Sequence, residues 1–129
     1  MTNASRRKRA WLYCRVAHSD PAILEMQRVH LIDYAEKQDF AIAGISAEHG
    51  SGLDFSRPGL CEVFEAAKNG EADVLLIANY SRLGRDMVKT CRCVQWLNEH
   101  HMEVVCADGT IIQDFPEPLD KWLKGQRAP

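Results

Sequence analysis

The residues that suggest chemistry in this sequence are four arginines from separate segments: Arg15, Arg57, Arg82 and Arg85. Each lies at the end of a predicted strand or in an adjoining loop, so we expect all four at one end of a sheet. Two cations about 4 Å apart repel by roughly 4 kcal/mol at an effective dielectric near 20. Folded proteins therefore gather guanidinium groups mainly where phosphate or carboxylate binds. The four arginines predict an anion-binding site.

Five short apolar runs predict the strands that would position this site, over residues 10–16, 40–45, 73–78, 103–106 and 110–113. The run at 73–78 is nearly continuous, which is typical of a parallel strand buried on both faces. Helical patterns alternate with these strands. We therefore predict an α/β fold with an open, mostly parallel sheet of about five strands and helices on both faces.

Three helices are predicted from their start signals and their apolar stripes. Asp20-Pro21, Pro58 and Asp86 are typical of helix starts, and Asn69-Gly70 is typical of a helix end. In the first helix, one stripe faces the sheet and consists of Leu24, Gln27, Leu31, Tyr34 and Ala35. Gln27 is the polar member of this stripe and lies near the N-terminal end of the helix. We therefore expect its amide to point toward the arginines.

The predicted topology adds Glu48 and Ser81 to the same end of the sheet. In open α/β sheets, ligands bind outside the carboxyl ends of the strands. Catalysis of phosphoryl transfer is mostly positioning and stabilisation of charge on the equatorial oxygens, which guanidinium groups can provide without a metal. No paired carboxylates indicate a magnesium site. We expect a phosphate site that uses no metal and no cofactor.

The composition indicates one globular domain with an acidic body. The chain has 129 residues, of which 46% are hydrophobic and 26% charged, and its net charge is −2. Residues 6–9 supply four of the 16 basic residues, which leaves 12 basic against 18 acidic residues, or −6. A domain that binds duplex DNA alone usually has a broad basic face, so we expect any DNA contact to be local and weak. We divide the chain into a basic N-terminal arm (1–9), a folded domain (10–115) and a short C-terminal tail (116–129).

The cysteines and the hydropathy pattern predict a reduced, cytoplasmic protein. The five cysteines are odd in number and contain no C-x-x-C pair, which favours free thiols over a disulfide framework or a zinc site. No apolar run approaches the roughly 20 residues that span a bilayer. The N-terminal region lacks the continuous apolar segment of a signal peptide. We expect no contact with a membrane.

Several short motifs in a fixed order carry a family resemblance. They are Tyr13-Cys14-Arg15-Val16, Gln27, Ser51-Gly52, Arg57-Pro58-Gly59-Leu60 and Ser81-Arg82-Leu83-Gly84-Arg85-Asp86. From about residue 10 to 113 this combination resembles the N-terminal catalytic domain of serine recombinases, the resolvase/invertase family. Several motifs in order are far more specific than one short match.

The resemblance implies site-specific DNA recombination by strand cleavage and exchange, as found in mobile elements and DNA integration. In that reaction a serine attacks the DNA backbone and forms a phosphoserine link, while arginines hold the scissile phosphate. Carried over to this chain, the catalytic residues would be Arg15, Gln27, Glu48, Arg57, Arg82 and Arg85, and the DNA-binding residues Arg15, Arg57, Ser81, Arg82 and Arg85. Glu48 stands where many members have aspartate, so it keeps the carboxylate but extends it by one methylene.

The sequence departs from the family at the nucleophile. In the family this serine directly follows the Arg-Val pair, and here the position is Ala17. A methyl group cannot attack phosphorus. Ser19 is a substitute candidate, but two extended residues shift it by roughly 6 to 7 Å, whereas attack needs about 3 to 3.5 Å. We therefore expect a domain that keeps its phosphate pocket and has impaired cleavage.

Other interpretations stay open beside this one. The chain could be an active enzyme that uses Ser19, or a dimerising interaction module that regulates a full-length recombinase. An unrelated nucleotide-binding protein is disfavoured because the first strand-to-helix loop lacks a Gly-x-Gly pattern. His18 and His49 flank the site, and either could contact phosphate. The expected partners are DNA, bound weakly through its backbone, and a second recombinase subunit in a homodimer or heterodimer. Family members continue into a long dimer-forming helix and DNA-binding domains, so we expect a stand-alone remnant or part of a longer product.

Overall fold

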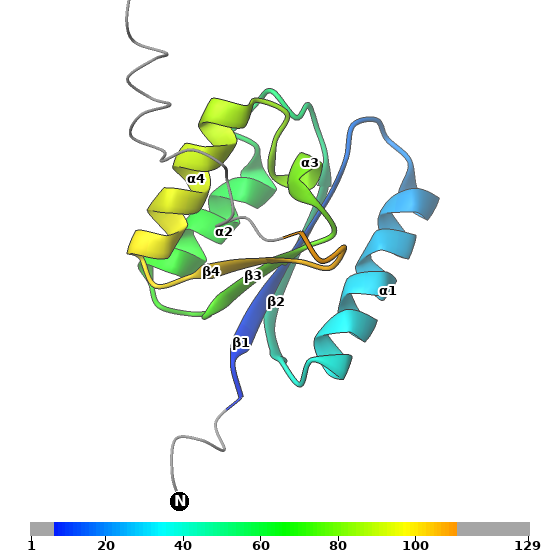
Figure 1. Cartoon of the computed structure of the whole chain (residues 1–129). Helices are drawn as coiled ribbons and strands as arrows, with labels where there is room; N and C mark the ends of the chain where they lie inside the picture. Colours follow the sequence, from blue (N-terminus) through cyan, green and yellow to red (C-terminus); the bar gives the residue numbers. More distant parts are fainter. Residues whose placement is uncertain (1–6, 111–129) are drawn as a thin grey trace, which may run out of the picture.

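Four parallel strands form the central sheet of the computed structural model, which describes residues 7–110 (Figure 1). They are β1 (Arg9–Val16), β2 (Ala41–His49), β3 (Val74–Ile77) and β4 (Glu103–Cys106). Their spatial order is β2-β1-β3-β4, and every pair of neighbours is parallel. All four residues of β3 are buried, as expected for a parallel strand that is covered on both faces. The predicted α/β fold with a mostly parallel sheet is confirmed.

Four helices connect the strands and cover both faces of the sheet. They are α1 (Pro21–Lys37), α2 (Pro58–Lys68), α3 (Tyr80–Leu83) and α4 (Met87–Glu99). The carboxylates of Asp20 and Asp86 accept hydrogen bonds from the backbone N–H groups of Ile23 and Lys89, both at 3.1 Å, which caps α1 and α4. Figure 1 shows α1 on one face of the sheet and α2 and α4 on the other.

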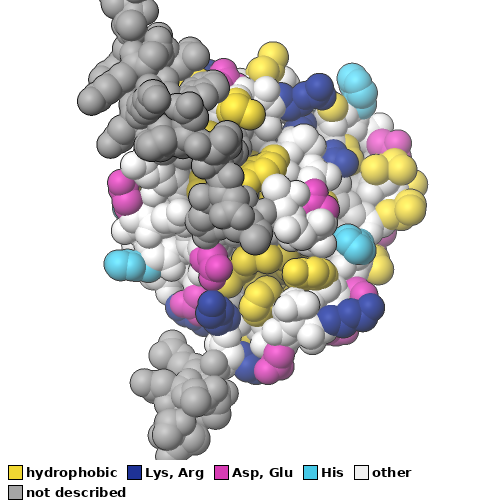
Figure 2. Space-filling model, viewed as in Figure 1, with side chains coloured by type: hydrophobic (Ala, Val, Ile, Leu, Met, Phe, Trp, Pro, Cys, Tyr) yellow, Lys and Arg dark blue, Asp and Glu magenta, His cyan; other side chains and the backbone are white. Residues whose placement is uncertain are grey.

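The visible surface of the domain carries charges of both signs. Figure 2 shows the Lys and Arg side chains as separate groups, interspersed with acidic, hydrophobic and other residues. Where the described residues form this face, it lacks the continuous basic surface that a DNA-binding domain acting alone usually presents. Within residues 7–110, no helix has both the length and the hydropathy needed to cross a bilayer.

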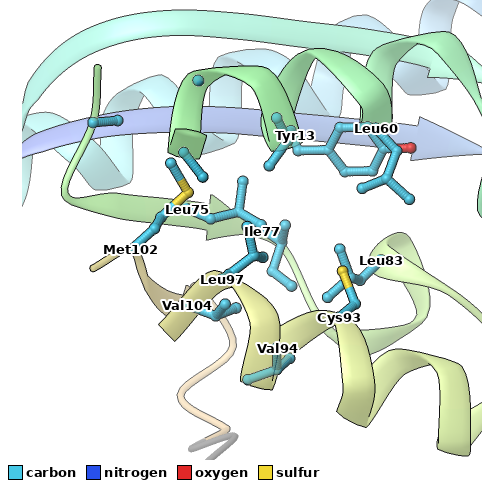
Figure 3. Packing of buried hydrophobic residues seen from close by; sticks show 14 of the residues in the cluster. Tyr13, Leu60, Leu75, Ile77, Leu83, Cys93, Val94, Leu97, Met102 and Val104 are labelled. Atoms are coloured by element: carbon cyan, nitrogen blue, oxygen red, sulfur yellow. The ribbon is translucent and has the colours of Figure 1, made fainter. Parts of the chain in front are cut away.

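Alternation along β1 divides the core into two clusters. Leu12 and Cys14 point to one face, where they pack with Leu31 of α1. Tyr13 points to the other face, where it joins Leu60 of α2 and the residues of α4 (Figure 3). Arg15 follows two residues after Tyr13, so the period of two in a strand directs both side chains to the same face. The sequence of β1 thus places an arginine at the end of a hydrophobic face.

The register of the sheet gathers three chain segments at its carboxyl edge. Arg15 lies beside Glu48, and Val16 lies beside His49. Because β1 is the neighbour of both β2 and β3, the segments that leave these three strands emerge together. This edge is where the sequence predicts the anion-binding site.

The structure corrects four details of the sequence-based expectations. The described sheet has four strands rather than about five, and the strand expected at 110–113 lies outside the described residues except for Thr110. The second strand extends to His49, so the following loop starts later than expected. The single-turn helix α3 was not predicted, because one turn is too short to show a periodic pattern. The spacing of Met87, Cys91, Val94 and Leu97 predicts that all four face the core, but Met87 is 57% exposed at the start of α4.

The cysteines agree with the prediction of reduced thiols. All five are free, and four of them are buried, whereas Cys61 is exposed on α2. Burial raises the pKa of Cys93 to about 12, and that of Cys14 and Cys106 to about 11. The buried thiols are therefore neutral core groups at physiological pH.

Candidate anion-binding site

Arg15 is buried at the carboxyl end of β1 and donates hydrogen bonds to three backbone carbonyls. Only 2% of its surface is exposed. Its Nε donates to the carbonyl of Arg82 at 3.0 Å, its Nη1 to that of Gly50 at 2.7 Å, and its Nη2 to that of Ser81. One guanidinium therefore joins β1 to the loop after β2 and to α3. Arg15 is thus a buried residue that holds the segments of the site together.

Gln27 and Arg82 hold the backbone of the same arginine. The side-chain amide of Gln27 accepts from the N–H of Arg15 at 3.0 Å and donates to its carbonyl at 3.2 Å, which confirms the expected direction of this amide. Nη1 of Arg82 donates to the same carbonyl at 2.9 Å, while its buried Nε has no hydrogen-bond partner among the described residues. Ser81 takes part through its carbonyl, because its hydroxyl donates to Asn79 at 2.6 Å. Helices α1 and α3 thus meet at the end of β1.

Arg57 is buried immediately before α2 and has more buried N–H groups without a partner than the other three arginines, as far as the described residues show. It is 3% exposed, and its Nη2 donates to the carbonyl of Leu83. Its Cζ lies 5.8 Å from the ring centroid of Tyr13 and 5.6 Å from that of Phe55. Within the described part of the chain, the buried Nε and Nη1 have no hydrogen-bond partner. Unpaired buried donors are costly, most of all on a charged group, so these two N–H groups are suited to an external acceptor.

Arg85 completes the group from the turn after α3. Its backbone N–H donates to the carbonyl of Gly52 at 2.7 Å, and its side chain is exposed. A Cβ atom on Gly52 would lie 2.2 Å from Cγ of Arg85 and 3.1 Å from Nη2 of Arg15. Gly52 therefore allows the two arginine side chains to approach the same loop closely. The structure brings together all four arginines that the sequence singled out.

The charges of this group are not neutralised by neighbouring carboxylates. Burial, followed by the positive charge of Arg57, lowers the pKa of Arg15, and the charges of Arg82 and Arg85 act in the same direction. The ion pairs formed within residues 7–110 involve other residues and none of these four arginines. A concentration of positive charge that lacks an internal counterion is what an anion-binding site requires.

Glu48 lies beside the arginines but makes its hydrogen bonds elsewhere. Its Oε1 accepts from the N–H of Gly59 at 2.7 Å, and its Oε2 from the N–H of Leu60 at 3.1 Å. The hydroxyl of Tyr13 donates to the same Oε2 at 2.6 Å. Burial, followed by this hydrogen bond, raises the pKa of Tyr13, so its hydroxyl remains a donor at neutral pH. Sequence reasoning did not identify Tyr13 as a site residue, although alternation in β1 places it on the face of Arg15.

The candidate nucleophiles lie in the exposed loop that follows β1. Ala17 comes directly after the last residue of this strand, and Ser19 lies two residues further on; both are exposed. His18 in the same loop and His49 at the end of β2 are exposed as well. At the position where the family resemblance calls for a serine hydroxyl, this chain presents a methyl group to solvent.

The comparison with protein families identifies the domain to which this site belongs. The family model described as "Resolvase, N terminal domain" matches residues 10–124. This chain belongs to the resolvase family. The expectation of a serine recombinase catalytic domain is thereby confirmed.

Solved structures support the fold of this resolvase-family domain. It is similar to the N-terminal catalytic domain of TP901-1 integrase, with a TM-score of 0.78, 19% identity, and coverage of 93% of this chain and 97% of that one. A resolvase family site-specific recombinase from Streptococcus pneumoniae matches with a TM-score of 0.76, 20% identity, and coverage of 94% and 89%. The catalytic domain of ISC1926 TnpA, an IS607-like serine recombinase, matches with a TM-score of 0.73, 23% identity, and coverage of 92% and 77%.

Proposed function

We propose that this resolvase-family domain binds a backbone phosphate of DNA through its arginine pocket and is impaired in DNA strand cleavage. The observation that carries the proposal is Arg57, a guanidinium with 3% exposure and two buried N–H groups that lack partners among the described residues. The site-specific recombinase and integrase titles of the similar structures favour DNA as the source of the anion. The activity class is therefore site-specific DNA recombination.

The pocket divides its arginines between two roles. The guanidinium of Arg15 donates hydrogen bonds to three backbone carbonyls and thereby holds the loops in place. Arg57 and Arg82 have unpaired buried N–H groups that can donate to phosphate oxygens, and the exposed Arg85 adds charge at the entrance. In a cleaving relative, such donors would stabilise the charge that develops on the phosphorus oxygens in the transition state.

Impaired cleavage follows from the residue at position 17. Nucleophilic attack on phosphorus needs an oxygen lone pair, and the methyl group of Ala17 has none. Ser19 would have to move by roughly 6 to 7 Å along an extended chain to reach the same point. We therefore assign the domain a non-cutting role, bound to DNA beside a cleavage-competent subunit in the cytoplasm.

An exposed stripe on α1 favours a second candidate function, a module that dimerises with a full-length recombinase and regulates it. Ile23, Met26 and Val29 lie at intervals of three residues and are 45%, 67% and 52% exposed. Three large apolar side chains on one exposed helix face are suited to contact with another protein. Co-purification with a recombinase that Met26→Lys abolishes, together with inhibition of that recombinase, would select this function.

Binding of inorganic phosphate tests the pocket itself. The Nε–H signal of Arg57 in a ¹⁵N-resolved NMR spectrum, assigned by its loss in Arg57→Lys, should shift on titration with phosphate. Arg57→Gln should abolish saturable binding at the pocket. The matched control Arg92→Gln makes the same charge change on the exposed face of α4 and should leave binding intact. Equal losses in both variants would reduce the effect to general electrostatics.

An activated phosphodiester tests the cleavage step. Bis(4-nitrophenyl) phosphate should leave the natural chain unmodified, whereas Ala17→Ser should release nitrophenolate and acquire a phosphoryl adduct at position 17, located by peptide mass spectrometry. Recovery of a phosphorylated peptide at Ser19 of the natural chain would overturn the non-cutting assignment and support an active enzyme.

A further inference from the structure

Helix α2 receives its N-terminal cap from the strand that precedes it, β2. Arg57 occupies the cap position but makes no side-chain hydrogen bond to the first turn. The carboxylate of Glu48 in β2 takes this role, because it accepts from the N–H groups of Gly59 and Leu60. A Cβ on Gly59 would lie 2.7 Å from Cδ of Glu48, so only glycine permits this approach. The backbone of Arg57 is therefore fixed by a carboxylate that does not touch its guanidinium.

Tyr13 connects this carboxylate to the arginine side chain. Its hydroxyl donates to Oε2 of Glu48 at 2.6 Å, while its ring lies 5.8 Å from Cζ of Arg57. Tyr13 itself is fully buried between the sheet and α2. The residue thus touches both the group that holds α2 and the group that would bind phosphate.

The hydrogen bonds of Glu48 also keep its carboxylate from pairing with the guanidinium of Arg57. Two helix N–H groups and one phenol occupy its two oxygens, and among residues 7–110 it forms no ion pair with an arginine. A carboxylate released from these donors would have a buried guanidinium nearby to pair with. Such a pair would occupy Arg57 and compete with an incoming anion.

We propose that Tyr13 and Glu48 are paired positioning residues, which fix Arg57 at the start of α2 and keep its two free N–H groups available to phosphate. This inference rests on the proposed phosphate-binding function. It adds Tyr13 to the functional residues of the pocket, and it assigns Glu48 an indirect role through α2 rather than contact with the anion.

The test compares phosphate affinities by the Nε–H signal of Arg57. Tyr13→Phe keeps the ring beside Arg57 and removes only the hydroxyl, and Glu48→Gln removes the charge and one of the two acceptors for α2. Each should raise the dissociation constant for inorganic phosphate by about tenfold, the effect of one lost charge-assisted hydrogen bond. The matched controls Tyr34→Phe and Glu36→Gln make the same changes on α1 and should bind phosphate as the natural chain does.

The sign of the Glu48→Gln effect separates positioning from simple electrostatics. Removing a negative charge beside four arginines would, by Coulomb attraction alone, strengthen phosphate binding. Loss of the cap on α2 would weaken it. Because the two residues act as one unit, the double variant should lose about the same tenfold as either single variant, not the product of the two effects.

The outcomes distinguish this inference from the function on which it rests. If the Arg57 signal of the natural chain does not respond to phosphate, the proposed function fails. If the natural chain binds phosphate and Tyr13→Phe binds equally well, the paired-positioning role is wrong. Tighter binding by Glu48→Gln would also contradict it. Should Glu48→Gln fail to fold, Tyr13→Phe still decides the question, because it removes a single oxygen atom.

Discussion

The same substitution should destabilise the fold strongly at Arg15 and leave its stability almost unchanged at Arg57. Both guanidinium groups are buried, at 2% and 3% exposure. Arg15 donates to three carbonyls, whereas Arg57 donates to one and leaves two buried N–H groups unpaired among the described residues. Replacement by methionine keeps a long flexible side chain and removes the charge. The difference between the two variants therefore measures how well each guanidinium is satisfied.

The magnitudes follow from the hydrogen bonds. Arg15→Met removes three part-buried hydrogen bonds from a charged group. Even at about 1 kcal/mol each, their loss should destabilise the fold by at least about 3 kcal/mol. Arg57→Met removes one charged hydrogen bond, worth about 1.5 to 3 kcal/mol, and two ring contacts of about 0.5 to 2 kcal/mol each. It also relieves two unpaired donors at about 1 to 3 kcal/mol each. The gains and losses nearly cancel, so we expect a change of no more than about 1 kcal/mol.

Urea unfolding in phosphate-free buffer, followed by the fluorescence of Trp11 and Trp96, provides the comparison. A second series in phosphate tests ligand linkage, because a ligand at a hundred times its dissociation constant stabilises the folded state by about 2.7 kcal/mol. The natural chain should gain this stabilisation and Arg57→Met should not. Equal destabilisation of the two methionine variants would refute the claim that Arg57 is held in an unsatisfied state.

Three further predictions concern the pocket loop and the thiols. Gly52→Ala should weaken phosphate binding by about tenfold, because the new Cβ lies 2.2 Å from Cγ of Arg85 and forces its exposed side chain to move. The contact with Nη2 of Arg15, at 3.1 Å, needs a shift of only a few tenths of an ångström, so the free energy of unfolding should change by less than about 1 kcal/mol. Binding equal to that of the natural chain would contradict this. Burial raises the pKa of Cys93 from 9.0 to about 12, so the unfolded state loses this proton first and stability should fall as pH rises from about 9 toward 12. In Cys93→Ala, the free energy of unfolding measured by urea at several pH values should fall less steeply over this range. The same pH dependence in both proteins would contradict the prediction. Cys61 should react with Ellman's reagent at least about tenfold faster than the four buried cysteines, and Cys61→Ser should remove the fast phase.

Much of the sheet and the place of the site could be predicted from the sequence. The continuous apolar run of β3 and the helix start signals at Asp20, Pro58 and Asp86 are local patterns, and each marks an element that the structure contains. The rule that ligands bind at the carboxyl ends of parallel strands then placed the arginines together. These inferences depend on residue types and spacing alone, which is why they transfer to the structure.

The hydrogen-bond partners of the site could not be predicted. Arg15 donates to the backbone carbonyls of Gly50, Ser81 and Arg82. Because every residue has such a carbonyl, residue types do not predict which ones accept. Glu48 lies at the expected end of the sheet, but its hydrogen bonds to the start of α2 could not be predicted from its residue type. Such details depend on the path of the loop backbone, which the pattern of side chains does not specify.

The different hydrogen bonding of Arg15 and Arg57 bears on the proposal that this pocket binds phosphate without cleaving DNA. Arg15 and Gln27 hold β1, α1 and α3 together, so their loss would damage the fold whether or not phosphate binds. The presence of Arg15 is therefore no measure of function. Arg57 is different, because its unpaired donors make no contribution to folding that a methionine could not replace. The two unpaired N–H groups of Arg57 are costly unless an anion accepts from them, and position 17 is alanine, so we propose binding without cleavage.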